Sequence, residues 1–283
     1  MARIPKKIAD VSDLLVGYQK AEYARSGSMR TRAMCAQVAL AIVSAITAFP
    51  LPDVVSTLLA VVATLVALAL GWATWEGRKS RSCAERLRRT ILLLNGLGAP
   101  LSESELRDIT SVCSATRSEA DALRDPAYFK SKAPLGARRL AENLAESAFW
   151  TRTLAGYASK DAWALFVGGV TFGLVVLAAT LIIQPTIATL GLRVVTVLLV
   201  LLLSADFCGV ARAYASAASE IEVIAERLNA ELRREPDLLA VVRILTDYNA
   251  AVEGMPQFSA KLYDRHRDEL NQLHGMWLTG RQP

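Results

Sequence analysis

Clusters of arginine are the residues of this sequence whose chemistry best suits an anionic ligand. The guanidinium group is planar and presents paired donors, so neighbouring arginines suit the recognition of phosphate groups. The clusters are Arg86, Arg88 and Arg89, then Arg138 and Arg139, then Arg233 and Arg234. The same residues would equally form the charged surface of helices, with some contact to anionic lipid headgroups. Both interpretations stay open for each cluster.

The sequence contains no arrangement typical of a catalytic or metal site. His266 and His274 are its two histidines, and they lie eight residues apart, whereas a helical metal pair prefers the i, i+4 spacing. The four cysteines are widely spaced and form no CxxC motif, so we expect neither a disulfide framework nor a zinc site. They are Cys35, Cys83, Cys113 and Cys208. Phosphate-binding loops, GxSxG, HExxH and dinucleotide-binding glycine motifs are also missing, and we predict a protein that is not an enzyme and uses no cofactor.

The arginine clusters are positioned by a chain with long apolar segments. Residues 162–184 form a run of 23 without a charge, and residues 187–209 form a second run of equal length with two charges. About 20 apolar residues cross a bilayer as a helix. Because proline disfavours helix in the residue before it, Pro185 predicts a turn between the two runs. Residues 161–209 are therefore predicted to form a transmembrane hairpin.

A similar hairpin is predicted nearer the start of the chain. Residues 33–49 and 54–75 are apolar, and the turn between them contains Pro50 and Pro52. Residues 33–75 would then supply two more spans, which makes four in all. Uncharged runs of this length are rare in soluble proteins, where the alternative would be a set of buried helices.

Charge distribution predicts the orientation of these hairpins. The chain is 53% hydrophobic and 21% charged, with a mean hydropathy of +0.30, which indicates membrane segments joined to charged soluble parts. Every Lys and Arg except Arg193 lies in residues 1–32, 76–160 or 207–283. Because Lys and Arg accumulate on the cytoplasmic side, both termini and the central segment are expected in the cytoplasm. The net charge of +5 is then a signal of topology, and we expect no nucleic-acid partner.

We predict an all-α integral membrane protein with two hairpins and a cytoplasmic helical bundle. Its parts are a cytoplasmic N-terminal amphipathic helix (1–32), a first transmembrane hairpin (33–75), a cytoplasmic helical middle region (76–160), a second transmembrane hairpin (161–209) and cytoplasmic C-terminal helices (210–283). Leu14, Leu15 and Tyr18 recur at helical spacing, which favours a helix lying at the membrane interface. A capping box at Ser102 predicts one helix that reaches about Leu123.

Polar residues within the spans are candidates for lining a pore or holding subunits together. They are Gln37, Ser44, Thr189, Arg193, Thr196, Ser204 and Asp206. Ionisable groups in a span usually face protein or water, although Arg193 and Asp206 would also reach opposite membrane surfaces by extending their side chains. Gly169 and Gly173 form a GxxxG motif, which lets helices pack closely in lipid. Helix packing is the simpler interpretation of these small and polar residues.

Several segments together resemble one family of membrane proteins. They are QKAEYA at residues 19–24, ENLAESAFWTRTL at 142–154, Asp247-Tyr248-Asn249, Pro256, Tyr263, Arg267 and Leu270-Asn271. With the two-hairpin layout, they resemble the SMODS- and SLOG-associating four-transmembrane effector family of bacterial defence loci. The resemblance implies a pore-forming effector of the inner membrane, which responds to a nucleotide second messenger from a partner nucleotidyltransferase or sensor. In anti-phage defence such an effector disrupts the membrane, and the infected cell stops growing or dies by abortive infection.

Three functional hypotheses compete at this point. The first is a ligand-gated pore, which would be a homo-oligomer because four helices of one chain pack too closely to enclose a wide channel. The second is a membrane scaffold without a pore, in which the polar residues of the spans only pack helices. The third is a small transporter, although transporters usually carry inverted repeats and broken helices, whereas these hairpins share one orientation.

Overall fold

The computed structural model describes residues 6–47, 49, 51–182, 191–192, 195–199, 201–202, 206–259 and 261–279. These residues form α-helices and irregular connections, with no strand among them. The helices are α1 (Lys6–Thr47), α2 (Asp53–Leu97), α3 (Glu103–Ser111), α4 (Arg117–Ala122), α5 (Ala137–Ile182), α7 (Phe207–Leu232), α8 (Leu238–Gly254) and α9 (Leu262–Thr279). The predicted all-α class is confirmed for this part of the chain.

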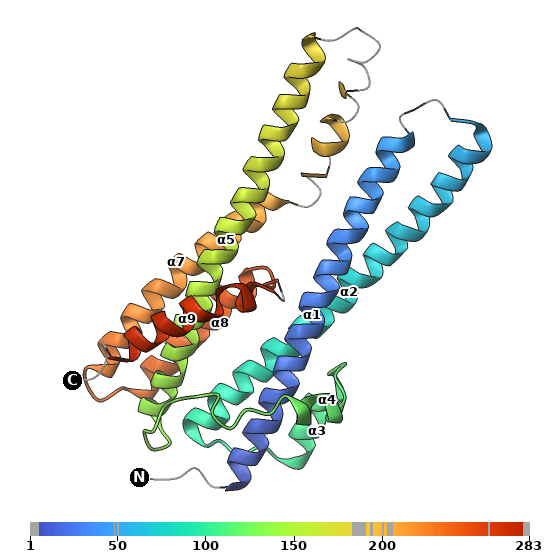
Figure 1. Ribbon diagram of the computed structural model, residues 1–283. Helices are drawn as coiled ribbons and strands as arrows, with labels where there is room; N and C mark the ends of the chain where they lie inside the picture. The colour runs from blue at the N-terminus through green and yellow to red at the C-terminus, as the bar shows by residue number, and fades with distance from the viewer. Residues whose placement is uncertain are drawn as a thin grey trace.

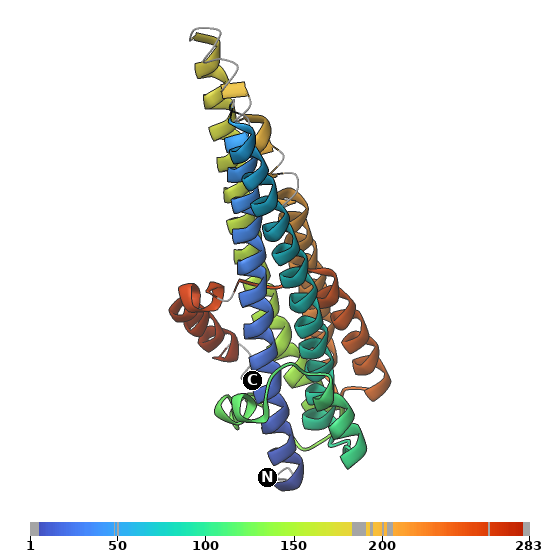
Figure 2. The same ribbon diagram turned by 90° about the vertical axis from the view of Figure 1, so that its right-hand side faces the viewer.

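The long helices form two pairs that lie side by side along an elongated molecule (Figure 1). Helix α1 packs along α2, and α5 packs along α7. The pairs meet through α2 and α5 in one half of the molecule. Figure 2 shows that the shorter helices α3, α4, α8 and α9 all gather in this same half. Among the described residues, the other half contains the extended ends of α1, α2 and α5 and short helical pieces between residues 191 and 202.

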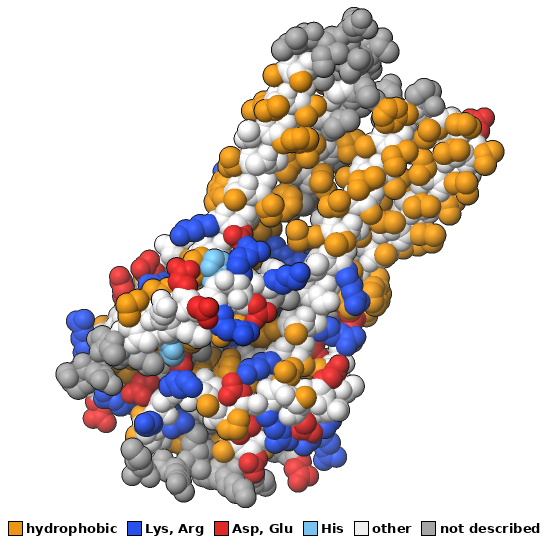
Figure 3. All heavy atoms as spheres, viewed as in Figure 1, with side chains coloured by type: hydrophobic (Ala, Val, Ile, Leu, Met, Phe, Trp, Pro, Cys, Tyr) orange, Lys and Arg blue, Asp and Glu red, His pale blue; other side chains and the backbone are white. Residues whose placement is uncertain are grey.

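Three helices are long and apolar enough to cross a membrane, judged by length and composition: Ile8–Thr47 of α1, Asp53–Leu97 of α2 and Ala137–Ala179 of α5. Their apolar ends expose large side chains, including Leu58 at 61% and Leu174 at 60% exposure. Figure 3 shows these hydrophobic side chains in one half of the molecule and nearly all of the charged side chains in the other. This separation is what a lipid-facing half and a water-facing half require. The predicted fourth span and its turn at Pro185 lie largely outside the described residues.

The three long helices continue without interruption from the apolar half into the charged half. They contain 42, 45 and 46 residues for α1, α2 and α5. At about 1.5 Å per residue, each is roughly twice as long as the hydrocarbon core of a bilayer, which is about 30 Å thick. The sequence boundaries drawn at residues 32, 75 and 160 therefore fall inside continuous helices. A displacement in the charged half would be carried directly into the apolar half.

The charged half contains two hydrophobic cores. Leu15, Leu87 and Ile109 belong to the core formed by α1, α2 and the α3–α4 region. The other core joins α5, α7 and α8, contains buried residues such as Ile221, and also includes Leu92 of α2. Phe129, in the connection before α5, packs against both cores. The boundary between these two cores forms a seam between the helix pairs.

The apolar face of the N-terminal helix, which was expected to contact the membrane interface, packs against protein instead. Leu14, Leu15 and Tyr18 are at most 6% exposed and lie within a protein core. The physical reason is a close approach of α4, which covers this face of α1. A Cβ atom added to Gly17 would lie 2.0 Å from the carbonyl oxygen of Ala120, so glycine permits the contact.

The helix predicted from Ser102 to about Leu123 is divided in two. Helix α3 ends at Ser111, and Thr116 opens α4 with a second capping box, in which its hydroxyl accepts from the Glu119 amide. The Glu119 carboxylate in turn accepts from the Thr116 amide at 2.6 Å. The second capping box satisfies the free backbone N–H groups in the first turn of α4. It therefore favours the start of a new helix over the continuation of α3.

The sequence predicted no disulfide framework, but the structure contains one disulfide. Cys83 of α2 and Cys113, just after α3, form a disulfide with their Cα atoms 5.8 Å apart. The break between α3 and α4 turns the chain back against α2 and brings together residues that are 30 positions apart. Sequence spacing does not reveal this proximity. Cys35 and Cys208 are free.

Candidate functional site

A cavity of about 710 Å³ lies at the seam between the two helix pairs. Helices α1 and α2 line one side, and α5, α8 and α9 line the other. The connection around residues 125–130 and the segment at 255–259 complete the wall. Small-molecule sites occupy about 300–1,000 Å³, so this cavity has the size of a site for a nucleotide-sized ligand.

Aromatic side chains give the cavity its broad apolar surfaces. Tyr23, Tyr128, Trp150, Tyr248 and Tyr263 all line it. Burial raises the pKa of Tyr128 to about 12 and also raises the pKa of Tyr248. Both phenols therefore stay neutral near pH 7, and the Tyr248 hydroxyl donates to the Ser147 carbonyl at 3.2 Å. Flat rings with polar edges suit a planar heterocycle that stacks and also forms hydrogen bonds.

Arg88 supplies a buried positive charge on the α2 side of the cavity. Its side chain is 8% exposed, and Nε donates to Glu85 Oε2 at 2.9 Å. Nη2 donates to Asn249 Oδ1 at 3.0 Å, and the guanidinium lies over the Tyr248 ring. Nη1 has no hydrogen-bond partner among the described residues. A buried charged donor without a partner is costly, and an anionic ligand in the cavity would satisfy it.

Two further lining groups also have unsatisfied polar atoms. Gln19 Oε1 has no hydrogen-bond partner among the described residues, while its amide nitrogen donates to Tyr128 Oη at 3.5 Å. His274 Nε2 likewise forms no hydrogen bond in the described part of the chain and lies 3.5 Å from Glu146 Oε1. Burial lowers the pKa of His274, which favours the neutral imidazole. The cavity thus offers a cation, an amide acceptor and a neutral imidazole to one ligand.

Arginines of the first helix pair also hold the C-terminal end of α8 and the segment after it. Arg81 Nη2 donates to the Val252 carbonyl at 2.9 Å. Arg89 pairs with Glu253 at 3.0 Å. These contacts, like that of Arg88 with Asn249, cross the seam beside the cavity. A ligand that changes the position of these arginines would therefore change how the two pairs fit together.

Arg30 forms the contact of this kind nearest to the apolar half. Its guanidinium donates to the Gln257 carbonyl and, at 2.7 Å, to Tyr214 Oη of α7. The Tyr214 hydroxyl also donates to the Gln257 carbonyl at 2.7 Å. Helix α1, helix α7 and the segment after α8 are therefore joined at one point.

The predicted arginine clusters do not form a single site. In the described part of the chain, Arg88 is the one of them that lines the cavity, while Arg89 pairs across the seam. Arg139 is buried and donates to the Asn95 and Ala133 carbonyls, so it fixes the start of α5. The remaining members are exposed: Arg86, Arg138, Arg233 and Arg234.

The polar residues predicted to line a pore are described only in part. Gln37 is half-buried in α1, and Ser44 is exposed. Thr196 is exposed and donates to the Leu192 carbonyl at 2.9 Å, which is a local helix contact. Asp206 caps α7 by accepting from the Gly209 amide at 3.0 Å. The other three lie outside the described residues: Thr189, Arg193 and Ser204.

The GxxxG glycines of α5 face the fourth apolar segment. A Cβ atom on Gly169 would lie 2.7 Å from Leu202 Cδ2, and one on Gly173 would lie 3.4 Å from Leu198 Cδ2. Both positions therefore allow this segment to approach α5 closely, as expected for small residues between helices in lipid.

Sequence analysis missed most of the cavity, although a usable signal was present. Arg81, Glu85 and Arg88 recur at i, i+4 and i+7, which places all three on one face of α2. The segments quoted for the family resemblance also supply cavity residues, including Gln19, Trp150 and others. Those others are Lys20, Tyr23, Glu146, Ser147, Thr151, Leu154, Tyr248, Pro256, Tyr263 and Asn271.

The chain matches no protein-family model, no curated protein and no solved structure.

Proposed function

We propose that this protein is a membrane effector that binds a nucleotide in the seam cavity and opens a pore in response. The observation that carries the proposal is the position of Arg88, a buried cation with an unsatisfied donor, between two helix pairs. Helices of both pairs continue into apolar segments of membrane-spanning length. A ligand bound to Arg88 would thus act directly on the junction between the two hairpins.

The chemistry of the cavity supports a nucleotide as ligand. Arginine suits phosphate because its fork of donors matches the phosphate oxygens. Tyr23, Trp150 and Tyr263 provide ring faces for a base, and base stacking on such rings tolerates any base. Gln19 and Asn271 provide amide groups for polar base edges or ribose hydroxyls. The volume of about 710 Å³ leaves room for more than one nucleoside unit.

We infer that the pore is gated by competition between the ligand and Asn249 for the Arg88 guanidinium. Without ligand, Arg88 bonds Glu85 and Asn249, and Arg81 bonds the carbonyl of Val252. A phosphate on Arg88 would weaken its contact with Asn249 and release α8 from α2. A ligand shifts such an equilibrium only by its difference in affinity between the two states. The continuous helices would carry the rearrangement into the membrane.

The biological setting rests on the charge pattern and the family resemblance. The distribution of Lys and Arg supports an inner-membrane protein with four spans, cytoplasmic termini and a cytoplasmic cavity. A homo-oligomer is required for a wide pore, and the polar residues of the spans are candidates for its lining. A nucleotide made by a partner nucleotidyltransferase after phage infection would open the pore and arrest growth.

The test combines ligand binding with vesicle leakage in the purified full-length chain. Cyclic dinucleotides, cyclic trinucleotides and linear nucleotides would be titrated by calorimetry, and dye release from proteoliposomes would be followed in parallel. We expect one nucleotide class to bind and to cause leakage. Arg88→Lys keeps the charge but loses the fork, and should weaken binding at least tenfold. Arg86→Lys is the matched control, because Arg86 is exposed two positions away on the same helix.

Three results would contradict parts of this proposal. Binding without leakage under any condition would refute the pore and leave a nucleotide-sensing scaffold. Failure of every nucleotide class to bind would refute the proposal that the ligand is a nucleotide. Equal loss of binding in Arg86→Lys and Arg88→Lys would contradict the assignment of the ligand to this cavity.

A further inference from the structure

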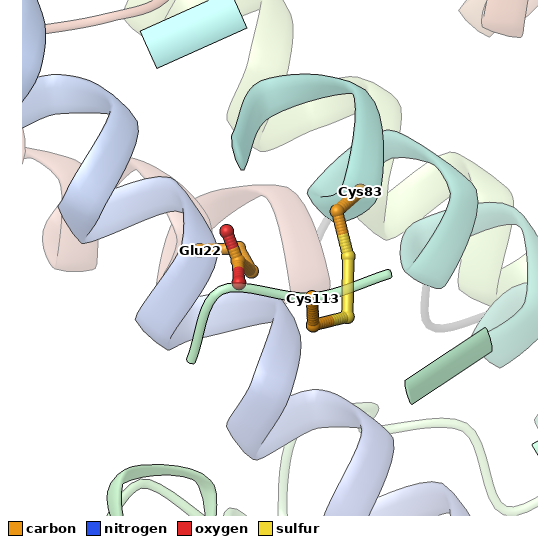
Figure 4. A group of neighbouring side chains, drawn as sticks. All are labelled: Glu22, Cys83 and Cys113. Carbon is orange, nitrogen blue, oxygen red and sulfur yellow. A yellow bond between two sulfur atoms is a disulfide. The ribbon is translucent and has the colours of Figure 1, made fainter. Parts of the chain in front are cut away.

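Glu22, Cys83 and Cys113 form a compact group of metal-binding side chains away from the cavity. Figure 4 shows them meeting from α1, α2 and the segment between α3 and α4. The carboxylate oxygen and the two sulfur atoms all lie within 4.8 Å of one another. Two ligands of one tetrahedral zinc ion are separated by about 3–4 Å, given zinc bonds of about 2.0–2.3 Å. The three atoms therefore reach a common ion with small side-chain movements.

Glu22 is a buried carboxylate that the disulfide does not satisfy. Its exposure is 0%, and Oε1 accepts from the Ala115 amide at 2.6 Å. Oε2 has no hydrogen-bond partner among the described residues. No Lys, Arg or His in the described part of the chain forms an ion pair with it within 4.0 Å. An isolated buried carboxylate is costly unless a cation or a metal compensates its charge.

We propose that the reduced pair Cys83 and Cys113 binds Zn²⁺ together with Glu22. Thiolates are soft ligands that favour zinc over magnesium or calcium, and a carboxylate is a common third ligand. The ion would neutralise the buried carboxylate, which explains its unpaired oxygen. Three protein ligands leave one position of a tetrahedral site for water. The proposal does not depend on nucleotide binding or on a pore.

Reduction of the disulfide is a condition for this site. Zinc binds thiolates, so the metal-bound pair and the disulfide exclude one another. Cytoplasmic thiols are kept reduced, and the distribution of Lys and Arg supports a cytoplasmic position for this half of the molecule. Zinc would then join α1, α2 and the α3–α4 segment at the point where the disulfide joins only two of them.

The position of the site gives the ion a structural role beside the cavity. Glu22 precedes Tyr23, which lines the cavity, and Gln19 lies one turn earlier on α1. Cys83 lies between Arg81 and Glu85, which line the cavity from α2. Zinc would therefore join these two helices within one turn of the residues that line the cavity.

The test measures zinc in the full-length chain purified in detergent with a phosphine reductant. Because the three ligands form a single site, we expect about one zinc per chain by mass spectrometry after dialysis against trace Zn²⁺. Co²⁺ should replace it and give the charge-transfer absorption of thiolate ligation. The double variant C83S/C113S should lose both signals. C35S/C208S is the matched control and should keep both, because those cysteines are free.

Glu22→Gln separates ligation from folding. It keeps the size of the side chain but removes the negative charge, so zinc affinity should fall at least tenfold while the thiolate–cobalt band persists. Helix content by circular dichroism shows whether each variant is folded. If the cysteine variants do not fold, the cobalt spectrum of the native chain still shows whether thiolates bind the metal. Absence of bound zinc in the reduced native chain, or unchanged zinc in C83S/C113S, would overturn the proposal.

Discussion

Arg88 of α2 and Asn249 of α8 are joined across the seam by a hydrogen bond of 3.0 Å between Nη2 and Oδ1. The same guanidinium lies 4.8 Å from the centre of the Tyr248 ring. One buried side chain thus touches the other helix pair through a polar contact and an aromatic contact. Like the contacts of Arg81 and Arg89, this contact makes the relative position of the two sides of the seam depend on a charged side chain.

The pair of Arg88 and Glu85 predicts a distinctive pattern of stability. Removing one partner of a buried ion pair costs about 3–5 kcal/mol, whereas replacing both with apolar residues is often neutral. We expect Arg88→Met to lower the unfolding free energy by roughly that amount, because the Glu85 carboxylate stays buried without its cation. Adding Glu85→Met should recover most of the loss. Denaturant titration in detergent, followed by circular dichroism, measures both variants.

The prediction has one contrary outcome and one control. If the double variant were no more stable than Arg88→Met, the contacts with Asn249 and Tyr248 would dominate the stability of the seam instead. Arg89→Met serves as the control, since its pair with Glu253 is nearly half exposed. An exposed pair contributes about 0–1 kcal/mol, so this variant should unfold much like the native chain.

Gly17 predicts a sharp difference between two glycine-to-alanine substitutions. A Cβ atom at position 17 would lie 2.0 Å from the backbone oxygen of Ala120, which cannot move like a flexible side chain. We expect Gly17→Ala to destabilise the chain by about 1–3 kcal/mol through overpacking. Gly156→Ala is the control, because no described residue lies within 4 Å of its Cβ position in α5. It should raise stability by roughly 0.5–1 kcal/mol. Equal melting temperatures for the two variants would show that α4 does not cover α1 this closely.

His274 predicts a loss of stability in mild acid. Its ring packs against Phe149 and Trp150, and burial lowers its pKa below 6.5, with a smaller contribution from Lys130. Glu146 lies 3.5 Å from the imidazole and opposes this shift. The unfolded state therefore binds a proton at a higher pH than the folded state. Stability that is present above about pH 6.5 should decline as pH falls below that value.

A variant that cannot titrate checks this dependence. His274→Phe should flatten the decline in melting temperature between about pH 7.5 and 5.5. His266→Phe changes the other histidine and should retain the decline. An unaltered pH profile in His274→Phe would assign the effect to carboxyl groups instead.

Local chemistry explains which parts of the fold were predictable. Helix α2 ends at Leu97, where Gly98 takes a left-handed φ of 71°, and its amide bonds the Leu94 carbonyl at 3.0 Å. The capping box at Ser102 likewise starts α3 as predicted. These features depend on a few adjacent residues, so the sequence is enough to place them. The apolar runs are predictable for the same reason.

The cavity depends on residues that meet only after folding. Adjacent arginines such as Arg88 and Arg89 suggested a shared phosphate site, but neighbours on a helix point about 100° apart. Arg88 therefore faces the cavity, while Arg89 pairs with Glu253 across the seam. The pairing of Cys83 with Cys113 was hidden for a similar reason, because it requires the break between α3 and α4. Spacing along a helix, as in Arg81, Glu85 and Arg88, would have been the better guide.

Gly169 predicts how closely α5 and the fourth apolar segment pack. A Cβ atom there would lie 2.7 Å from Leu202 Cδ2, the far end of a flexible side chain, whereas no described residue lies within 4 Å of a Cβ atom on Gly168. We expect Gly169→Ala to be tolerated, since the leucine can turn away. Gly169→Ile should cost about 1–3 kcal/mol by forcing the two segments apart, and Gly168→Ile should cost far less. Thermal unfolding in detergent ranks the three variants. Because packing in lipid depends on close approach, equal destabilisation by isoleucine at both positions would mean that these glycines do not set the separation of the second hairpin.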